Sequence, residues 1–335
     1  MDSMEIRLAS RPKRRATPED FAAATVEVPD PGPGQVQVRN SFVSVDPYMR
    51  NRMNDMPSYV PPFAVGEPLT GGAVGRVIAS RSTDVPEGAL VSSMFGWREA
   101  FTADAAAVQV LPEPPPGVAE SAYLGVLGMP GMTAWVGVTQ IAPVREGDVF
   151  FVSAASGAVG SAAGQLARAR GASLVLGSAG APAKVAAVRD EFGFDDCFSH
   201  VDGEPLPHLQ RLAPKGIDVY FDNVGGAQLA AALVVFRPFG RAALCGAIST
   251  GYDGTPGHPV ATMGLVVGKR LALRGFIVSD HADLQTAFLE EVGPLVAGGR
   301  LAFRETVVEG IASAPEALLA LFEGGAQIGK VVVAL

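Results

Sequence analysis

Cysteine, histidine, aromatic residues and charge are all scarce in this chain of 335 residues. It has two cysteines and four histidines, while aromatic residues make up 7% and charged residues 18%. Cys197 and Cys245 lie far apart, so they form neither a disulfide framework nor a CxxC zinc pattern, and they fit a reducing compartment. The histidines show no HExxH or Cys/His spacing, so we expect no metal site.

A basic surface and a long apolar run are also absent. Lys and Arg number 26 against 34 Asp and Glu, a net charge of −8, which argues against a nucleic-acid partner. No apolar run approaches the roughly 20 residues that span a bilayer. The hydrophobic share of 48% is enough for a large core. We expect a soluble cytoplasmic protein with no membrane partner.

The first third of the chain has the pattern of short strands. Gln35–Arg39 alternates with period two, and Gly71–Ala79 and Val91–Phe95 are further candidates bounded by glycine. The proline-rich stretch 111–117 can continue neither a helix nor a central strand, so a domain boundary is expected just after it. The tail returns to strands, notably Phe303–Val308 and Lys330–Ala334. We therefore predict a β-rich domain over 1–122, completed by 300–335.

From Asp148 onward, unbroken apolar segments alternate with helical ones. Such strands, separated by helices of about ten residues, are typical of a parallel sheet covered on both faces. The sequence thus predicts an α/β fold with a doubly wound parallel sheet over 123–299. The expected strands are Val149–Ala155, Ser173–Ser178, Ile217–Asn223, Arg241–Ile248 and Leu271–Val278, and the expected helices are Gly157–Arg170, Pro182–Phe192, Ala227–Phe236 and Ala282–Ala297.

A glycine-rich turn follows the first of these strands. It matches the dinucleotide fingerprint G-x-G-x-x-G with Ala155 in place of the first glycine. Gly157 lets the backbone approach a pyrophosphate, Gly160 lets the helix pack close to the strand, and the helix N-terminus offers N–H groups to phosphates. The alternative is an ordinary tight turn, but the strand–turn–helix context favours a nucleotide site.

The next strand favours NADPH over NADH as the cofactor. An NAD site usually has a carboxylate about 20 residues after the turn to bind the ribose 2′-hydroxyl, and the stretch 174–180 has none. Lys184 follows closely, where its ammonium group can meet a 2′-phosphate. A charge-assisted hydrogen bond of about 1.5–3 kcal/mol corresponds to roughly 10- to 150-fold in affinity. A solvated helix lysine is the alternative.

A series of sequence blocks carries a family resemblance. In order they are Val45–Arg50 (VDPYMR), Leu127–Ala134 (LGMPGMTA), the turn Ala154–Gly164, Asp218–Gly226 (DVYFDNVGG), Leu244–Ser249 (LCGAIS), Val307–Gly310 and Ala314–Leu318. Together they resemble the zinc-independent medium-chain dehydrogenases/reductases, in the group of the prostaglandin, 2-alkenal and curcumin reductases. The match runs from about Ile6 to the C-terminus.

The resemblance implies a GroES-like β-rich domain, a Rossmann domain, a homodimer, and NADPH-dependent reduction of the C=C bond of enones and enals. It implies a phosphate turn at Gly157, Ala158, Val159 and Gly160, a 2′-phosphate lysine at Lys184, and cofactor-lining residues at Asn223, Cys245, Gly246, Ala247, Ile248, Ser249, Thr250, Phe276, Ile277 and Val278.

Four positions depart from the family pattern. His200 stands where relatives commonly place a tyrosine near the 2′-phosphate, and its charge depends on pH. Gln327 replaces an asparagine before the closing Gly-Lys, Gly268 replaces a tyrosine, and the loop at Ser249 has one extra residue before Tyr252. These changes leave the cofactor prediction intact, with His200 and Gln327 among its residues, but leave the proton donor open.

Two tyrosines are the candidate catalytic residues. Hydride addition to the β-carbon leaves enolate charge on the carbonyl oxygen, which needs a hydrogen-bond donor, and a neutral tyrosine can supply one. Tyr48 is a candidate by its block and Tyr252 by approximate position. The cofactor ribose hydroxyl or water are alternative donors. A quinone reductase on the same scaffold and a non-catalytic NADPH-binding protein are the alternative functions.

Overall fold

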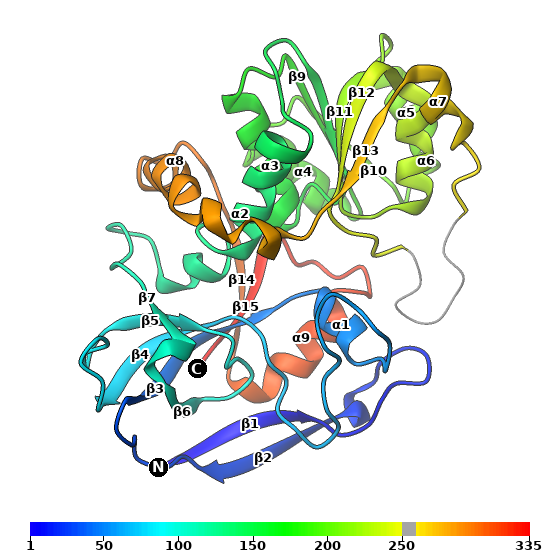
Figure 1. The fold of residues 1–335 in the computed structure, drawn as a ribbon. Helices are drawn as coiled ribbons and strands as arrows, with labels where there is room; N and C mark the ends of the chain where they lie inside the picture. The colour runs from blue at the N-terminus through cyan, green and yellow to red at the C-terminus, as the bar shows by residue number, and fades with distance from the viewer. Residues whose placement is uncertain (250–258) are drawn as a thin grey trace. The chain divides into compact units, whose positions relative to one another are not determined.

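The computed structural model describes residues 1–249 and 259–335 (Figure 1). Thr250 and Tyr252, two of the predicted site residues, therefore lie outside the described residues. The described chain forms two compact units, one of Met1–Leu124, Glu305–Gly325 and Lys330–Leu335, the other of Gly125–Arg304 and Ala326–Gly329. No helix in these ranges has both the length and the apolar character needed to cross a membrane.

The first unit is built on a seven-stranded sheet. Its strand order is β14-β15-β3-β4-β5-β7, with β6 also paired to β3. Only the β14–β15 pair is parallel. The strands are β3 (Gln35–Val45), β4 (Ala73–Ser80), β5 (Leu90–Ser93), β6 (Ala100–Asp104), β7 (Val108–Val110), β14 (Glu305–Glu309) and β15 (Lys330–Ala334), and β1 (Asp2–Leu8) and β2 (Phe21–Glu27) form a separate antiparallel pair.

The chain's last strand lies inside this sheet, between β3 and β14. Its first residue, Lys330, is 4% exposed, and the Nζ atom donates to the Val45 carbonyl at 2.7 Å and to Asp46 Oδ1 at 3.0 Å. A buried ammonium group needs such partners, because desolvation of a bare charge is very costly. Two short helices belong to the same unit, α1 (Tyr48–Arg52) and α9 (Ala314–Ala320).

The second unit is a six-stranded sheet in which every pair of neighbouring strands is parallel. Its order is β10-β9-β8-β11-β12-β13, which is the 3-2-1-4-5-6 order of a doubly wound Rossmann fold. The predicted fold class is therefore confirmed. The strands are β8 (Val149–Val152), β9 (Leu174–Ala179), β10 (Asp196–Ser199), β11 (Ile217–Asp222), β12 (Phe236–Leu244) and β13 (Ala272–Gly275).

Helices cover both faces of this sheet (Figure 1). One group, α2, α3 and α8, packs together, and a second group, α5, α6 and α7, does the same. All four residues of β8 are buried, as its unbroken apolar run predicts. The helices are α2 (Met129–Val136), α3 (Ala158–Ala169), α4 (Pro182–Asp190), α5 (Pro205–Leu212), α6 (Gly226–Val235), α7 (Gly264–Lys269) and α8 (Gln285–Ala297).

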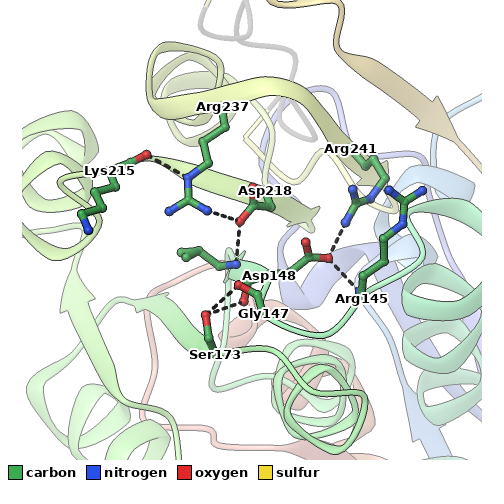
Figure 2. Close-up of polar contacts among 9 residues, drawn as sticks. Arg145, Gly147, Asp148, Ser173, Lys215, Asp218, Arg237 and Arg241 are labelled. Atoms are coloured by element: carbon green, nitrogen blue, oxygen red, sulfur yellow. Dashed lines mark hydrogen bonds and ion pairs between the residues drawn. The ribbon is translucent and has the colours of Figure 1, made fainter.

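Ion pairs join the amino ends of three neighbouring strands (Figure 2). Asp148, just before β8, accepts from the Arg145 backbone N–H at 2.7 Å and pairs with Arg241 of β12. Asp218 of β11 accepts from the Val149 N–H at 2.9 Å and pairs with Arg237 at 2.6 Å. These bonds hold the amino ends of β8, β11 and β12 together at the switch point of the strand order, and ligands of doubly wound folds bind at the opposite, carboxyl end.

Candidate cofactor site

The glycine turn after β8 is shaped for close backbone approach. Ala154 has a positive φ of 51°, and α3 begins at Ala158 with Gly157 as its N-cap, without a side-chain cap. A Cβ at Gly160 would overlap the Ala154 carbonyl group, whereas one at Gly157 would meet only the Ala154 oxygen, at an ordinary 3.4 Å. Gly160 is therefore required by helix–strand packing, and Gly157 leaves open the side a phosphate would approach.

Ala155 replaces the first glycine of the fingerprint, and a glycine on the neighbouring strand β9 leaves room for its methyl group. It is fully buried, and a Cβ at Gly177 of β9 would lie only 2.6 Å from the Ala155 Cβ atom. The glycine at 177 therefore makes the room that the fingerprint's own glycine usually supplies. This compensation explains why the turn keeps its form despite the altered motif.

A C-terminal segment of the chain returns to this turn. The Gly329 N–H donates to the Ser156 carbonyl at 2.7 Å, and Gly329 forms a parallel bridge with Gly157. Gly329 has a φ of 75°, and a Cβ there would overlap the Arg304 carbonyl group, so only glycine fits. Gln327, two residues earlier in the chain, is half-buried.

Two basic residues follow the carboxyl ends of β9 and β10. Lys184 lies in the first turn of α4, and the His200 N–H donates to the Ala179 carbonyl at 3.0 Å, with its ring beside Gly180. Burial lowers the pKa of Lys184. Desolvation lowers the pKa of His200, the Ala179 carbonyl opposes this shift, and the charge of Lys184 adds a smaller lowering effect. Neither of these two predicted 2′-phosphate residues has an acidic partner in the described ranges.

Asn223 is held by a buried polar network at the end of β11. Its Nδ2 donates to the Ser153 carbonyl at 2.8 Å, and its backbone N–H donates to Ser153 Oγ at 2.9 Å. The adjacent Asp222 Oδ1 accepts from Tyr220, Ser153 and the N–H groups of Val224 and Gly225. Burial raises the pKa of Asp222 despite these bonds. Sequence reasoning missed this support, although the Asp-Asn pair lay inside a recognised block.

The loops after β12 and β13 lie at the same carboxyl edge of the sheet. Cys245 and Gly246 each donate a backbone N–H to the Asp222 carbonyl, at 2.9 and 3.0 Å, and Ser249 Oγ donates to the Val224 carbonyl at 2.6 Å. Phe276, with Ile277 and Val278 directly after it, packs edge-on against Phe221 with ring centroids 6.3 Å apart. Three predicted segments, distant in sequence, thus lie at the carboxyl ends of β11, β12 and β13.

Tyr48 belongs to the β-rich unit, at the start of α1. It is half-buried, and burial, followed by the charge of Asp46, raises its pKa. A hydrogen bond with Arg52 opposes this to a smaller extent. The Arg52 guanidinium group lies 4.0 Å from the centroid of the Phe63 ring and donates to the Thr70 carbonyl at 3.2 Å. The phenol therefore stays protonated near neutral pH, and Arg52 is a neighbour that the sequence alone did not indicate.

The residues at this edge of the sheet fit a dinucleotide with an additional phosphate. A twelve-residue helix begins at an uncapped glycine on the switch point, and two basic groups without acidic partners lie at the end of the adjacent strand. Positive groups gathered without a countercharge suit a phosphate ligand.

Comparisons with known proteins agree with this geometry. Residues 4–111 match the family model of an N-terminal domain of oxidoreductase, and residues 158–292 match that of a zinc-binding dehydrogenase. The chain is 41% identical to the NADP⁺-dependent 2-alkenal reductase of Nicotiana tabacum over 92% of its length and 89% of that protein's. It is 36% identical to the NADPH-dependent curcumin reductase of Escherichia coli, over 97% and 95% of the two chains.

The chain belongs to the medium-chain dehydrogenase/reductase family, in the group of the prostaglandin, 2-alkenal and curcumin reductases. Among solved structures, this medium-chain reductase resembles CurA from Vibrio vulnificus, with a TM-score of 0.92 and 36% identity over 99% and 98% of the two chains. CurA has also been solved in complex with NADPH.

One of the two matching family models is described as zinc-binding. Within residues 1–249 and 259–335 of this reductase, no group of three or more His, Cys, Asp or Glu residues is arranged to hold a metal ion. Cys197 is buried and Cys245 is partly buried, and burial raises the pKa of both thiols to about 12.

Proposed function

We propose that this protein is an NADPH-dependent reductase that saturates the C=C bond of α,β-unsaturated aldehydes and ketones. The observation that carries the proposal is the sequence identity of 41% and 36% to a 2-alkenal and a curcumin reductase, over 92% and 97% of the chain. Lys184 and His200, which follow β9 and β10, support it. The residues predicted for the cofactor, from the turn at Gly157 to Val278 and Gln327, are proposed to line it.

The chemistry requires binding, orientation and one proton donor. When bound, NADPH supplies a hydride to the β-carbon of the substrate. The charge that develops on the carbonyl oxygen then needs an aimed donor. We assign this role to Tyr48, whose O–H remains protonated because burial and Asp46 raise its pKa. Tyr252 remains a second proposed donor on the strength of its sequence position.

The decisive experiment is to incubate the protein with deuteride-labelled NADPH and a simple enone, and then to locate the label. Deuterium on the β-carbon is the expected result. Label on the carbinol carbon would instead identify a carbonyl reductase. Bound NADPH without transfer to any enone would favour a quinone reductase, which semiquinone formation would reveal, or a non-catalytic NADPH-binding protein.

The proton-donor assignment has its own test in Tyr48→Phe, with Tyr123→Phe as the matched control. Tyr123 is also buried, and its hydroxyl donates to the Pro112 carbonyl at 3.0 Å. Both variants therefore remove one tyrosine hydroxyl from the same unit. Loss of an aimed donor reduces kcat by about 100-fold. Equal turnover of the two variants would leave Tyr48 a packing residue only.

A homodimer formed through the edge of the parallel sheet is also proposed. β13 pairs only with β12 among the described strands, and its residues are mostly exposed. Val267 on α7 is 80% exposed and Phe239 is 65% exposed. A second copy pairing along β13 would cover this edge. Light scattering should give twice the chain mass, and Val267→Lys should lower it.

The cytoplasm is the proposed location. Both cysteines are free in the structure, and the reaction depends on NADPH, a cofactor of reducing compartments. Cell fractionation with detection of the protein tests this, and its recovery from a secreted fraction would contradict it.

A further inference from the structure

Asp222 is a buried carboxylate to which the proposed mechanism gives no role. It is the last residue of β11 and is 1% exposed. Its Oδ1 atom accepts from the Tyr220 hydroxyl at 2.7 Å and from Ser153 Oγ at 3.1 Å. The same atom accepts from the backbone N–H groups of Val224 and Gly225, at 2.9 and 2.7 Å. Four donors on one oxygen favour the ionised form of the carboxyl group.

The charge of Asp222 has no cationic partner. The four donors are uncharged hydroxyl and N–H groups, and within residues 1–249 and 259–335 Asp222 takes part in no ion pair. Burial raises the pKa of Asp222, and the hydrogen bonds oppose that shift. Because desolvation is costly, a buried charge is normally paired. Here hydrogen bonds stabilise a negative charge that no cation neutralises.

The position of Asp222 places this charge on one side of the dinucleotide site. In a doubly wound fold the pyrophosphate binds at the turn after the first strand, here β8, and the residue that recognises the adenosine ribose follows the second, here β9. The other nucleoside, which carries the nicotinamide ring, therefore lies on the side of β11, β12 and β13. The lining segments predicted there, 223–226, 245–249 and 276–278, contain no charged residue.

Asp222 is joined directly to two of these lining segments. It precedes Asn223 in the chain, and its backbone carbonyl accepts from the N–H groups of Cys245 and Gly246 at 2.9 and 3.0 Å. Burial, followed by the charge of Asp222, raises the pKa of the Cys245 thiol to about 12. The field of the carboxylate therefore reaches the loop that is proposed to line the cofactor.

Hydride transfer changes the charge of the nicotinamide half of the cofactor. The C4–H bond of the reduced ring breaks, the hydride forms a C–H bond at the β-carbon of the substrate, and the ring changes from neutral to a charge of +1. The enolate takes one proton, which solvent supplies through the proposed donor. A negative charge on this side of the site attracts the oxidised ring and leaves the neutral reduced ring almost unaffected.

We infer that the Asp222 carboxylate stabilises the positive charge that the nicotinamide ring acquires, so that the protein favours NADP⁺ over NADPH and makes the bound NADPH a stronger hydride donor. The inference rests on the proposed function for the identity of the cofactor and the direction of the reaction. Asp222 acts through its charge, and it neither accepts the hydride nor supplies the proton.

The test is Asp222→Asn, which removes the charge but keeps an oxygen that can accept the same hydrogen bonds. NADPH binding is measured by its fluorescence, and NADP⁺ binding by competition with NADPH. We expect the Kd for NADP⁺ to rise about 10-fold and the Kd for NADPH to change less than about 2-fold. For a two-electron couple, this tenfold change in the ratio of the two constants raises the potential of the bound cofactor by about 30 mV.

Tyr220→Phe is the matched control, because it removes one of the four donors and keeps the charge of Asp222. A change in packing or in loop position should weaken the binding of both forms of the cofactor together. The ratio of the two Kd values in Tyr220→Phe should therefore stay within about 2-fold of the wild type. Asp222→Ser is a second variant without the charge, and it should shift the ratio in the same direction as Asp222→Asn.

The outcomes separate this inference from the proposed function. Equal ratios in the wild type and Asp222→Asn would overturn the inference and leave the reductase proposal intact, and so would an equal shift in Tyr220→Phe. If neither variant without the charge folds, the wild-type protein decides, because weaker binding of NADP⁺ than of NADPH would overturn the inference. Failure of the wild type to bind either form would overturn both proposals.

Discussion

At the amino end of the six-stranded sheet, both carboxylates drawn in Figure 2 are ion-paired, whereas at the carboxyl end Lys184 and His200 have no acidic partner in the described ranges. Asp148 and Asp218 are matched with Arg241 and Arg237 across β8, β11 and β12. The comparison teaches that one sheet uses charge in two ways. Paired charges hold the strands together, and unpaired charges of one sign make a place for an anion.

The largest expected effect is on stability, at the amino end. Asp148→Asn removes the countercharge of Arg241, whose side chain is 14% exposed. Leaving one member of a mostly buried ion pair costs about 3 kcal/mol. Denaturant unfolding should show this loss, while NADPH affinity of the folded protein stays unchanged. The double variant Asp148→Asn/Arg241→Met should recover much of it, and failure to recover would mean that Asp148 acts through Arg145 instead.

The matching change at the carboxyl end should affect binding alone. Lys184→Ala removes a basic group that pairs with no residue in the described ranges, so the free energy of unfolding should hardly change. NADPH affinity should fall roughly 10- to 150-fold, the equivalent of about 1.5–3 kcal/mol, with NADH unaffected. Lys215→Ala, at the amino end (Figure 2), is the control and should change neither affinity. An unaltered NADPH/NADH ratio in Lys184→Ala would remove Lys184 from the phosphate site.

Gly157 and Gly160 allow the same distinction, between residues that bind and residues that stabilise, to be tested within one turn. Gly157 has extended backbone angles and room for a Cβ, so Gly157→Ala should fold with a stability change below about 1 kcal/mol. A methyl group there would obstruct the pyrophosphate and weaken NADPH binding about 10-fold. Gly160→Ala, which overlaps the Ala154 backbone, should instead lower stability. Fluorescence titration and thermal unfolding of both variants distinguish these roles.

Local patterns predicted most of the parallel sheet. The strand β8, the helix α3 and the turn between them follow from apolar runs and glycine spacing, and the expected strand Lys330–Ala334 has the observed bounds. The edge strand β10 was not predicted, because its four residues include an aspartate and lack a long apolar run.

Contacts between distant segments could not be predicted in this way. The bond from Gly329 to Ser156 joins residues that lie far apart in the sequence, and no periodicity signals it. The same holds for the room that Gly177 makes for Ala155, and for the four donors around Asp222. The sequence showed which residue types occur at the site. The hydrogen bonds and packing contacts that position them come from distant segments and depend on the tertiary structure.

The smallest predicted effect tests whether the amino-end network acts by charge or by hydrogen bonding. Asp218→Asn leaves an amide oxygen that can still accept from the Val149 N–H, but it removes the charge facing Arg237, whose side chain is 33% exposed. Because water screens a pair this exposed, the loss should be about 1 kcal/mol or less, and smaller still in high salt. Urea unfolding at low and high ionic strength measures it. A loss as large as that of Asp148→Asn would show that hydrogen-bond geometry at Asp218, rather than its charge, joins β11 to β8.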